Sequence, residues 1–147
     1  MAEPTTTVKY IFDQAIKLMD EQSDTGASEW ADTEEYKNRA LAIMNVLIGE
    51  CYPFSDTYRV DVPGKRPICQ PVASMNSVVF LDDSLAKTVL PYGLASELIK
   101  NDDPTMGNYF LQRYQELLAR HAKTLPAQWD AIEDVYGGLQ FNQFGGW

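Results

Sequence analysis

The chain has 147 residues, of which 45% are hydrophobic and 22% charged, so it can bury one core without help from disulfides. A net charge of −9 at pH 7 argues against binding to nucleic-acid backbones, which requires clustered Lys and Arg. The longest basic run is Lys65-Arg66, and no apolar run approaches the ~18 residues of a membrane span. We therefore expect one folded domain, made in the cytoplasm, that does not contact a membrane.

Two amphipathic helices are predicted in the first third of the chain. Threonines at 5–7 offer an N-cap, and apolar residues then recur every three or four positions. This first stripe consists of Val8, Ile11, Phe12, Ala15, Ile16 and Met19. We expect this helix to end near residues 20–22, before a polar loop. Asp32 and Glu35 form a capping-box pattern at the start of the second helix, which Pro53 ends. The second stripe consists of Tyr36, Ala40, Ile43, Met44, Leu47 and Cys51.

Residues 54–82 change character, because prolines break any helix there. Residues 58–62 alternate with a period of two before the Pro63-Gly64 turn, so we expect a β-hairpin or an extended arm. Residues 77–81 suit either a strand or an extended segment pressed on the helices. The predicted arm contacts are Tyr58, Arg59, Lys65 and Arg66. Their positive charge suits acidic residues of a neighbour and, equally, a solvated turn.

Residues 90–120 predict two amphipathic helices joined by a tight turn, the first with an apolar stripe of Leu90, Leu94 and Leu98. Proline suits the first turn of a helix, and an acidic residue before it suits the N-cap. The residues expected to build this hairpin are Leu90, Pro91, Gly93, Leu94, Asp103, Pro104 and Tyr114. Asp82-Asp83 likewise precede a short helical turn at 85–89. For this pair and for Asp102-Asp103, helix capping is favoured over a metal or acid–base site. The hairpin cannot bury both of its stripes in itself, so other elements must cover it.

The last part of the chain predicts a short helix at 125–132 and then an extended tail at 137–147. Aromatic residues recur every third position in this tail, between glycines. Packing on its own domain remains open, but the glycines favour insertion into a partner. The predicted docking residues are Tyr136, Gly137, Gly138, Phe141, Phe144 and Trp147. The predicted fold is thus mainly α: a bundle of four to five helices over residues 1–136, with the arm around 54–82.

Signatures of enzymes are absent from the sequence, which has no glycine-rich phosphate loop, no G-x-S-x-G and no H-E-x-x-H. His121 is the single histidine, and we interpret it as a surface or helix-end residue. Cys51 continues an apolar stripe and is interpreted as a core thiol, while Cys69 is too distant for a CxxC motif. We therefore predict no enzyme: no catalytic residue, no metal and no cofactor.

Three segments resemble the head–tail adaptor, or head-completion connector, proteins of tailed bacteriophages and prophages. The first is RALAIMN at 39–45, which leads to ECYP at 50–53. The second begins with LPYGLA at 90–95 and runs through Asp102-Asp103 to Arg113-Tyr114, and the third is DVYGG at 134–138. The resemblance implies a mainly α-helical subunit that assembles into a ring, commonly of twelve copies, beneath the portal of the capsid.

Such a ring lies in the virion neck, extends the DNA channel, and offers a platform for the next connector, stopper or tail protein. By resemblance, an arm at 58–68 and the tail at 137–147 reach neighbouring subunits or the portal protein. Genomic DNA would pass through without sequence-specific binding, for which an acidic wall is better than a basic one. Because a ring contact is heterologous, each subunit must offer two different patches.

Two other functions remain open. A small helical DNA-recognition subunit of the phage packaging terminase would also form rings, and it predicts exposed basic residues on the second helix of a helix-turn-helix. Only Arg113 and Arg120, with Lys123 beyond them, are available there, so we prefer the adaptor. An enzyme would require His121 to cluster with acids in a pocket.

Overall fold

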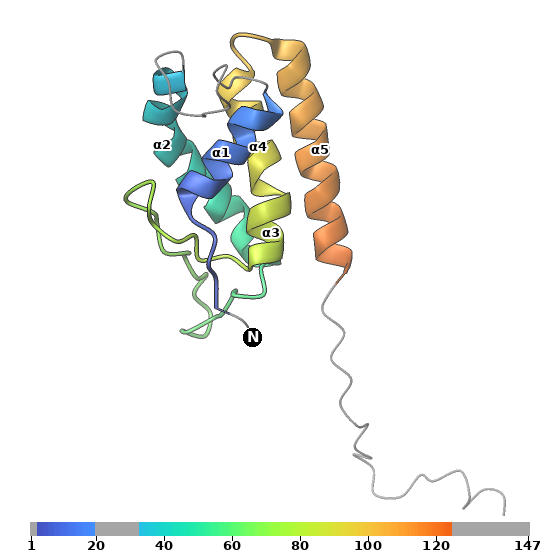
Figure 1. The fold of residues 1–147 in the computed structure, drawn as a ribbon. Coiled ribbons are helices and arrows are strands. Elements are labelled where there is room, and N and C mark those ends of the chain that lie inside the picture. The colour runs from blue at the N-terminus through green and yellow to red at the C-terminus, as the bar shows by residue number, and fades with distance from the viewer. Residues whose placement is uncertain (1–2, 20–32, 125–147) are drawn as a thin grey trace, which may run out of the picture.

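The computed structural model describes residues 3–19 and 33–124, and this part of the chain is mainly α-helical, as predicted. The elements are α1 (Val8–Leu18), α2 (Glu34–Cys51), the 3-10 turn η2 (Tyr52–Phe54), α3 (Asp83–Thr88), α4 (Leu90–Ile99) and α5 (Pro104–Lys123). Figure 1 shows the helices side by side, with α3 leading directly into α4. The helix predicted at 125–132 and the tail at 137–147, with all six of its docking residues, lie outside the described residues.

Helix α4 is the centre of the bundle, because α1, α2, α3 and α5 all pack against it (Figure 1). Leu90, Leu94 and Leu98, the predicted stripe, are fully buried. Each such leucine contributes roughly 1.5–3 kcal/mol through removal of its side chain from water. The helices that cover the hairpin are thus the amphipathic ones predicted from the N-terminal half of the chain.

Helix α1 begins at Val8, as predicted, and ends at Leu18, earlier than expected. Thr7 is its N-cap, and its hydroxyl oxygen accepts a hydrogen bond from the Tyr10 N–H at 3.2 Å. In α2 the predicted stripe is buried except for Ile43, which is half-buried. The capping box that involves Asp32 lies outside the described residues and stays a prediction.

Residues 77–79 run beside the start of α1 as an extended segment. The Val8 N–H donates to the Ser77 carbonyl at 3.1 Å, and the Val79 N–H donates to the Thr6 carbonyl at 2.8 Å. This pairing amounts to one isolated antiparallel bridge, not a sheet. Of the two alternatives for this stretch, the extended segment pressed on the helices is therefore the correct one.

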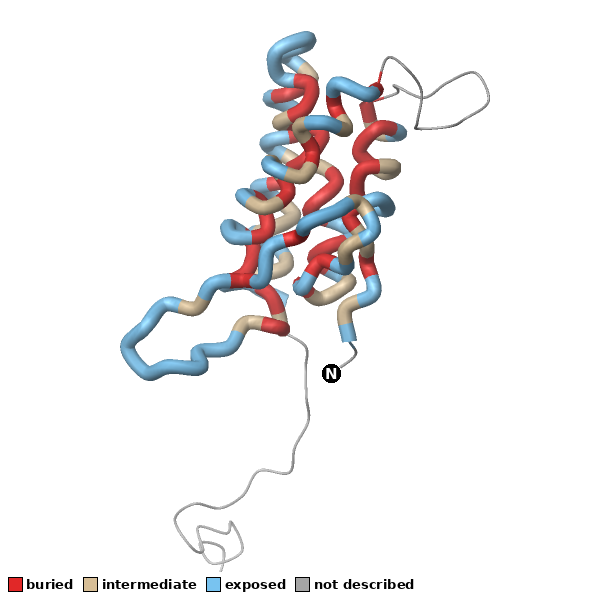
Figure 2. Tube along the Cα trace, turned by 90° about the vertical axis from the view of Figure 1, so that its left-hand side faces the viewer, coloured by how far each residue is buried: buried red, intermediate tan, exposed pale blue. Residues whose placement is uncertain are grey.

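Of the two alternatives predicted for this stretch, a β-hairpin or an extended arm, the β-hairpin is wrong. Residues 59–68 form a loop that projects from the bundle and is exposed along nearly its whole length (Figure 2). Gly64, at a φ of +78°, allows the turn, and the Lys65 N–H donates to the Val62 carbonyl at 3.1 Å. The alternating pattern has no buried face, because Val60 and Val62 are both more than half exposed. A two-stranded hairpin with nothing to cover it is marginal in water.

The hairpin of α4 and α5 is confirmed, including its turn. Asp103 caps α5 by accepting a hydrogen bond from the Met106 N–H at 3.2 Å, and Pro104 is the first helical residue. Two glycines allow the helices to approach each other closely. A Cβ atom on Gly93 would lie 2.9 Å from the ring of Tyr114. At the other end of the hairpin, a Cβ atom on Gly107 would lie 2.9 Å from the backbone of α4's C-cap residue.

Candidate functional site

The arm, defined here as residues 59–68, carries the largest group of exposed apolar side chains among the residues described. Val60, Val62 and Ile68 are 54%, 55% and 89% exposed. The predicted basic residues Arg59, Lys65 and Arg66 are exposed beside them. Exposed apolar side chains on a projecting loop make the arm a candidate interaction surface.

Tyr58 does not belong to the exposed part of the arm. Its ring packs edge-on against Tyr52, with the ring centroids 5.1 Å apart. This residue therefore anchors the start of the arm to the end of α2. The predicted contacts of Tyr58 and of the three basic residues with a neighbour stay a prediction. The structure shows only that Tyr58 packs on its own domain, while the basic residues are exposed.

Asp82 fixes the start of the arm to helix α3. One oxygen of its carboxylate accepts hydrogen bonds from the Ser55 hydroxyl at 2.8 Å and from the Asp56 N–H at 3.0 Å. Its other oxygen accepts from the Leu85 N–H at 3.0 Å, which is the predicted N-cap. The Asp82 side chain thus caps the N-terminus of α3 and also binds the residues that precede the arm.

His121 lies in the last turn of α5, as interpreted, but its side chain is only 15% exposed. Its Nε2 atom lies 3.6 Å from the carboxylate of Asp82, whose opposite oxygen binds the Ser55 hydroxyl. In a catalytic triad the imidazole stands between the hydroxyl and the carboxylate, so that it can take the proton of the hydroxyl. Here the Asp82 carboxylate lies between the His121 imidazole and the Ser55 hydroxyl. This cluster therefore holds the arm in place and does not have the geometry of a triad.

In each acidic pair, the member that does not cap a helix makes a tertiary contact. Asp83 accepts four hydrogen bonds of 2.7–3.1 Å from the backbone and hydroxyl groups of Thr5 and Thr6. These bonds, those of Thr5 first, hold the pKa of the Asp83 carboxyl well below its usual range. Asp102 accepts the hydroxyl of Tyr36 at 2.7 Å.

Capping is thus confirmed for Asp82 and Asp103, while sequence reasoning missed the roles of Asp83 and Asp102. Within residues 3–19 and 33–124, no three His, Cys, Asp or Glu side chains come together as a possible metal site. Helix capping and tertiary hydrogen bonds therefore account for Asp82-Asp83 and Asp102-Asp103.

Cys51 is a core thiol, as predicted, and is fully buried. Its Sγ atom lies 3.2 Å from the hydroxyl of Tyr114, which donates a hydrogen bond to Glu50 at 3.0 Å. Burial raises the pKa of the Cys51 thiol to about 11, and burial also raises the pKa of Tyr114. A thiol that stays protonated at neutral pH is a poor nucleophile, so Cys51 is structural.

Stability is expected to fall as the pH rises from 9.0 to about 11. The folded state favours the protonated Cys51 thiol, because its pKa is about 11 there and 9.0 without burial. The resulting stabilisation is complete below pH 9.0 and is lost as the pH passes through the folded-state pKa, by up to about 3 kcal/mol. Urea unfolding at about pH 8 and about pH 10.5 should show a larger loss for the wild type than for Cys51→Ala. Equal losses would contradict this prediction.

A groove lies between α2, α4 and α5, with a volume of about 290 Å³. We call it the helix groove and define it by Val46, Glu50, Glu97 and Leu111. Val46 is 62% exposed and Leu111 is 38% exposed, so the groove offers apolar surface to water between two carboxylates. Sequence reasoning missed this surface. The available signal was that Val46 falls outside the apolar stripe of its helix.

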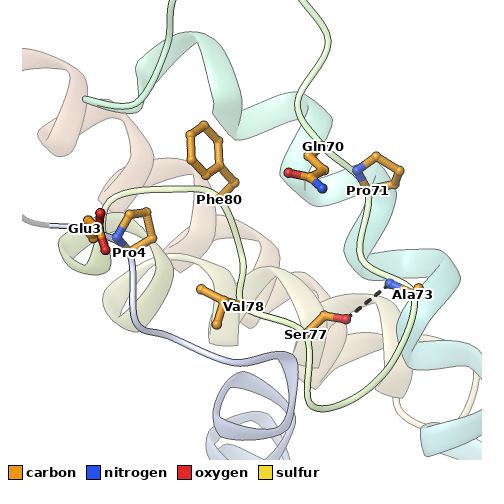
Figure 3. Close-up of a pocket in the computed structure, with 8 residues that line it drawn as sticks. All are labelled: Glu3, Pro4, Gln70, Pro71, Ala73, Ser77, Val78 and Phe80. Carbon is orange, nitrogen blue, oxygen red and sulfur yellow. Dashed lines mark hydrogen bonds between the residues drawn. The ribbon is translucent and has the colours of Figure 1, made fainter.

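A second hollow, of about 540 Å³, lies between residues 3–4 and the segment at 70–80 (Figure 3). Val78 and Phe80 contribute half-exposed apolar side chains to it, and Pro4 and Pro71 line it as well. Among the described residues that line it, Glu3 alone is ionisable. These residues therefore suit apolar contact and do not supply the paired groups that acid–base chemistry requires.

Family models, curated proteins and solved structures give no match to this chain. No helix of the described ranges is both long and apolar enough to cross a membrane. The features that bear on function are therefore the arm, the helix groove and the resemblance of the three sequence segments.

Proposed function

We propose that this chain is a head–tail adaptor subunit of a tailed bacteriophage. Copies of it form a ring, with twelve as the expected number, beneath the portal protein in the neck of the virion. The ring extends the DNA channel and provides the platform on which the next connector, stopper or tail protein docks. The role is structural and needs neither a catalytic residue nor a cofactor.

The observation that carries this proposal is the exposed arm on a small helical bundle. Ile68 is 89% exposed, and Val60 and Val62 of the same loop are each more than half exposed, which favours a surface that a partner covers. A subunit that is buried among copies of itself gains from such a loop, because its apolar residues lose contact with water on assembly. The three segments at 39–53, 90–114 and 134–138 add the resemblance to the adaptor family.

The charge of the chain agrees with this role. With a net charge of −9, a ring of such subunits presents many carboxylates, and we propose that some of them line the channel. An acidic wall repels the phosphate backbone, so DNA can slide past without being held. A map of the potential of the assembled ring tests this point. A basic lumen with all acidic residues on the outer rim would contradict it.

The terminase alternative receives less support from helix α5. Arg113, the basic residue nearest the middle of that helix, is paired with Glu116 at 3.1 Å and stacks over the ring of Tyr92. Arg120 and Lys123 remain exposed in the last turn. A recognition helix needs several side chains free to reach base edges and phosphates.

Deletion of residues 137–147 is expected to abolish attachment to DNA-filled heads while leaving the domain folded. The aromatic residues of this tail are the predicted anchors in the portal or a neighbour, and truncated aromatic anchors cost the most binding energy. Attachment is measured by co-sedimentation of the purified chain with heads that lack it. Circular dichroism of the shortened chain serves as the folding control. An unfolded truncated chain would instead place the tail in the core, and full attachment would contradict its role in docking.

A further inference from the structure

Helix α2 separates the arm from the helix groove. Residues that follow the arm are fixed to one side of α2 by two hydrogen bonds, from Asn45 Nδ2 to the Val72 carbonyl at 3.2 Å and from the Val72 N–H to Asn45 Oδ1 at 2.8 Å. Positions 45, 48 and 49 face this side, whereas positions 43, 46, 47 and 50 line the groove. With 3.6 residues per turn, the two sets point in nearly opposite directions. The arm therefore cannot enter the groove of its own copy without crossing the helix.

The two surfaces are complementary in charge. The arm carries three basic residues and one acidic residue, Asp61, whereas two carboxylates, of Glu50 and Glu97, border the helix groove. Within residues 3–19 and 33–124, the one partner of the Glu97 carboxylate is Lys100, at 2.9 Å, in a largely exposed ion pair. Such a pair contributes little to stability, so an incoming guanidinium group can replace the lysine at small cost.

The two surfaces are also complementary in polarity. Val46 and Leu111 expose apolar surface in the groove, and Val60, Val62 and Ile68 expose it on the arm. Contact between the two sets would remove both from water, which is the main favourable term in association. A heterologous contact needs two different patches on one subunit, placed so that the next copy can repeat the contact.

We propose that the arm of one copy docks in the helix groove of the next copy, with its apolar side chains on Val46 and Leu111 and a basic side chain at Glu97. This inference rests on the adaptor ring proposed above and specifies the contact that builds it. Repetition of the contact around the ring leaves neither surface exposed.

Disulfide trapping in the full chain tests this contact. Val46→Cys combined with Val62→Cys places one thiol in the groove and one on the arm, and both positions are more than half exposed. Under mild oxidation, assembled copies should give a ladder of covalent dimers, trimers and higher species on a non-reducing gel. The native Cys51 and Cys69 are buried and should not compete.

A matched control combines Val46→Cys with Tyr109→Cys, because Tyr109 is 53% exposed but lies outside the groove. This control should give no ladder. A second measurement uses charge: Arg66→Glu should weaken self-association tenfold or more, and added Glu97→Arg should restore it. Circular dichroism verifies that each variant is folded.

Two results would overturn the proposed contact. One is a product that stops at the monomer or at the covalent dimer, since a repeating head-to-tail contact must give longer species. The other is trapping of Val46→Cys by Phe144→Cys instead of Val62→Cys, which would assign the groove to the tail. If the wild type still forms rings that attach to heads, only the contact is wrong. If the wild type neither forms rings nor binds portal-bearing heads, the adaptor proposal itself fails.

Discussion

Replacement of Tyr114 with alanine is expected to lower the free energy of unfolding by about 3–5 kcal/mol. Tyr114 is 4% exposed, and its ring lies against Gly93 of α4. Its hydroxyl donates a hydrogen bond to Glu50 and lies 3.2 Å from the Cys51 Sγ atom, both in α2. Alanine would leave a cavity where three helices meet, and the surrounding helices can relax into it only in part. Urea unfolding followed by circular dichroism measures the loss.

The variant Tyr114→Phe separates packing from hydrogen bonding. It keeps the ring and removes the hydroxyl, so it should cost about 1 kcal/mol, which is typical of one lost hydrogen bond. Equal losses for the two variants would assign the role of Tyr114 to its hydroxyl. A loss below about 1 kcal/mol for Tyr114→Ala would contradict a central packing role.

Replacement of Asp82 with alanine is expected to cost about 2–4 kcal/mol, because it removes the N-cap of α3 together with charge-assisted hydrogen bonds. It should also release the start of the arm, since Ser55 and the Asp56 N–H lose their shared acceptor. Trypsin cleaves after Lys and Arg unless proline follows, so the arm offers it the bonds after Arg59 and Lys65. Cleavage there should therefore become faster than in the wild type, in addition to the loss measured in urea.

Asp83→Ala is the matched control for this experiment. It removes a neighbouring carboxylate whose partners are Thr5 and Thr6, so it should loosen the N-terminal segment and leave cleavage in the arm unchanged. Asp82→Asn keeps an oxygen acceptor and should fall between the wild type and Asp82→Ala. Equal acceleration of arm cleavage by Asp82→Ala and Asp83→Ala would show that the effect is a general loss of stability.

The helices and their ends could be predicted because their signals are local. The period of apolar residues located the stripe of Leu90, Leu94 and Leu98, and the caps at Thr7 and Asp103 lie within three residues of the N–H groups that they satisfy. Local patterns of this kind are independent of how the helices are arranged in space.

The arrangement of the arm could not be predicted in the same way. An alternating pattern requires a partner strand and a covering layer to become a sheet, and neither is visible in the pattern itself. Contacts such as that of Asp83 with Thr5 join residues 78 positions apart, and nothing in either local sequence indicates the other.

The candidate site was accessible to sequence reasoning only in part. The basic residues of the arm were identified, because charge and a Pro-Gly turn occur together in the sequence. The helix groove was not, because it exists only where three helices meet. Val46 and Leu111 are separated by 65 positions, so their shared surface is a property of the fold.

The two close approaches in the hairpin have a mechanical consequence. Gly93 meets Tyr114 near one end of the α4–α5 pair, and Gly107 meets Lys100 near the other, each at a distance that leaves no room for a side chain. If α5 moved along α4 by one turn, about 5.4 Å, residues with side chains would have to take the positions that the two glycines occupy at these contacts. The pair therefore resists shear along its axis, and a load applied at one end of α5 reaches the rest of the bundle as a rigid-body displacement.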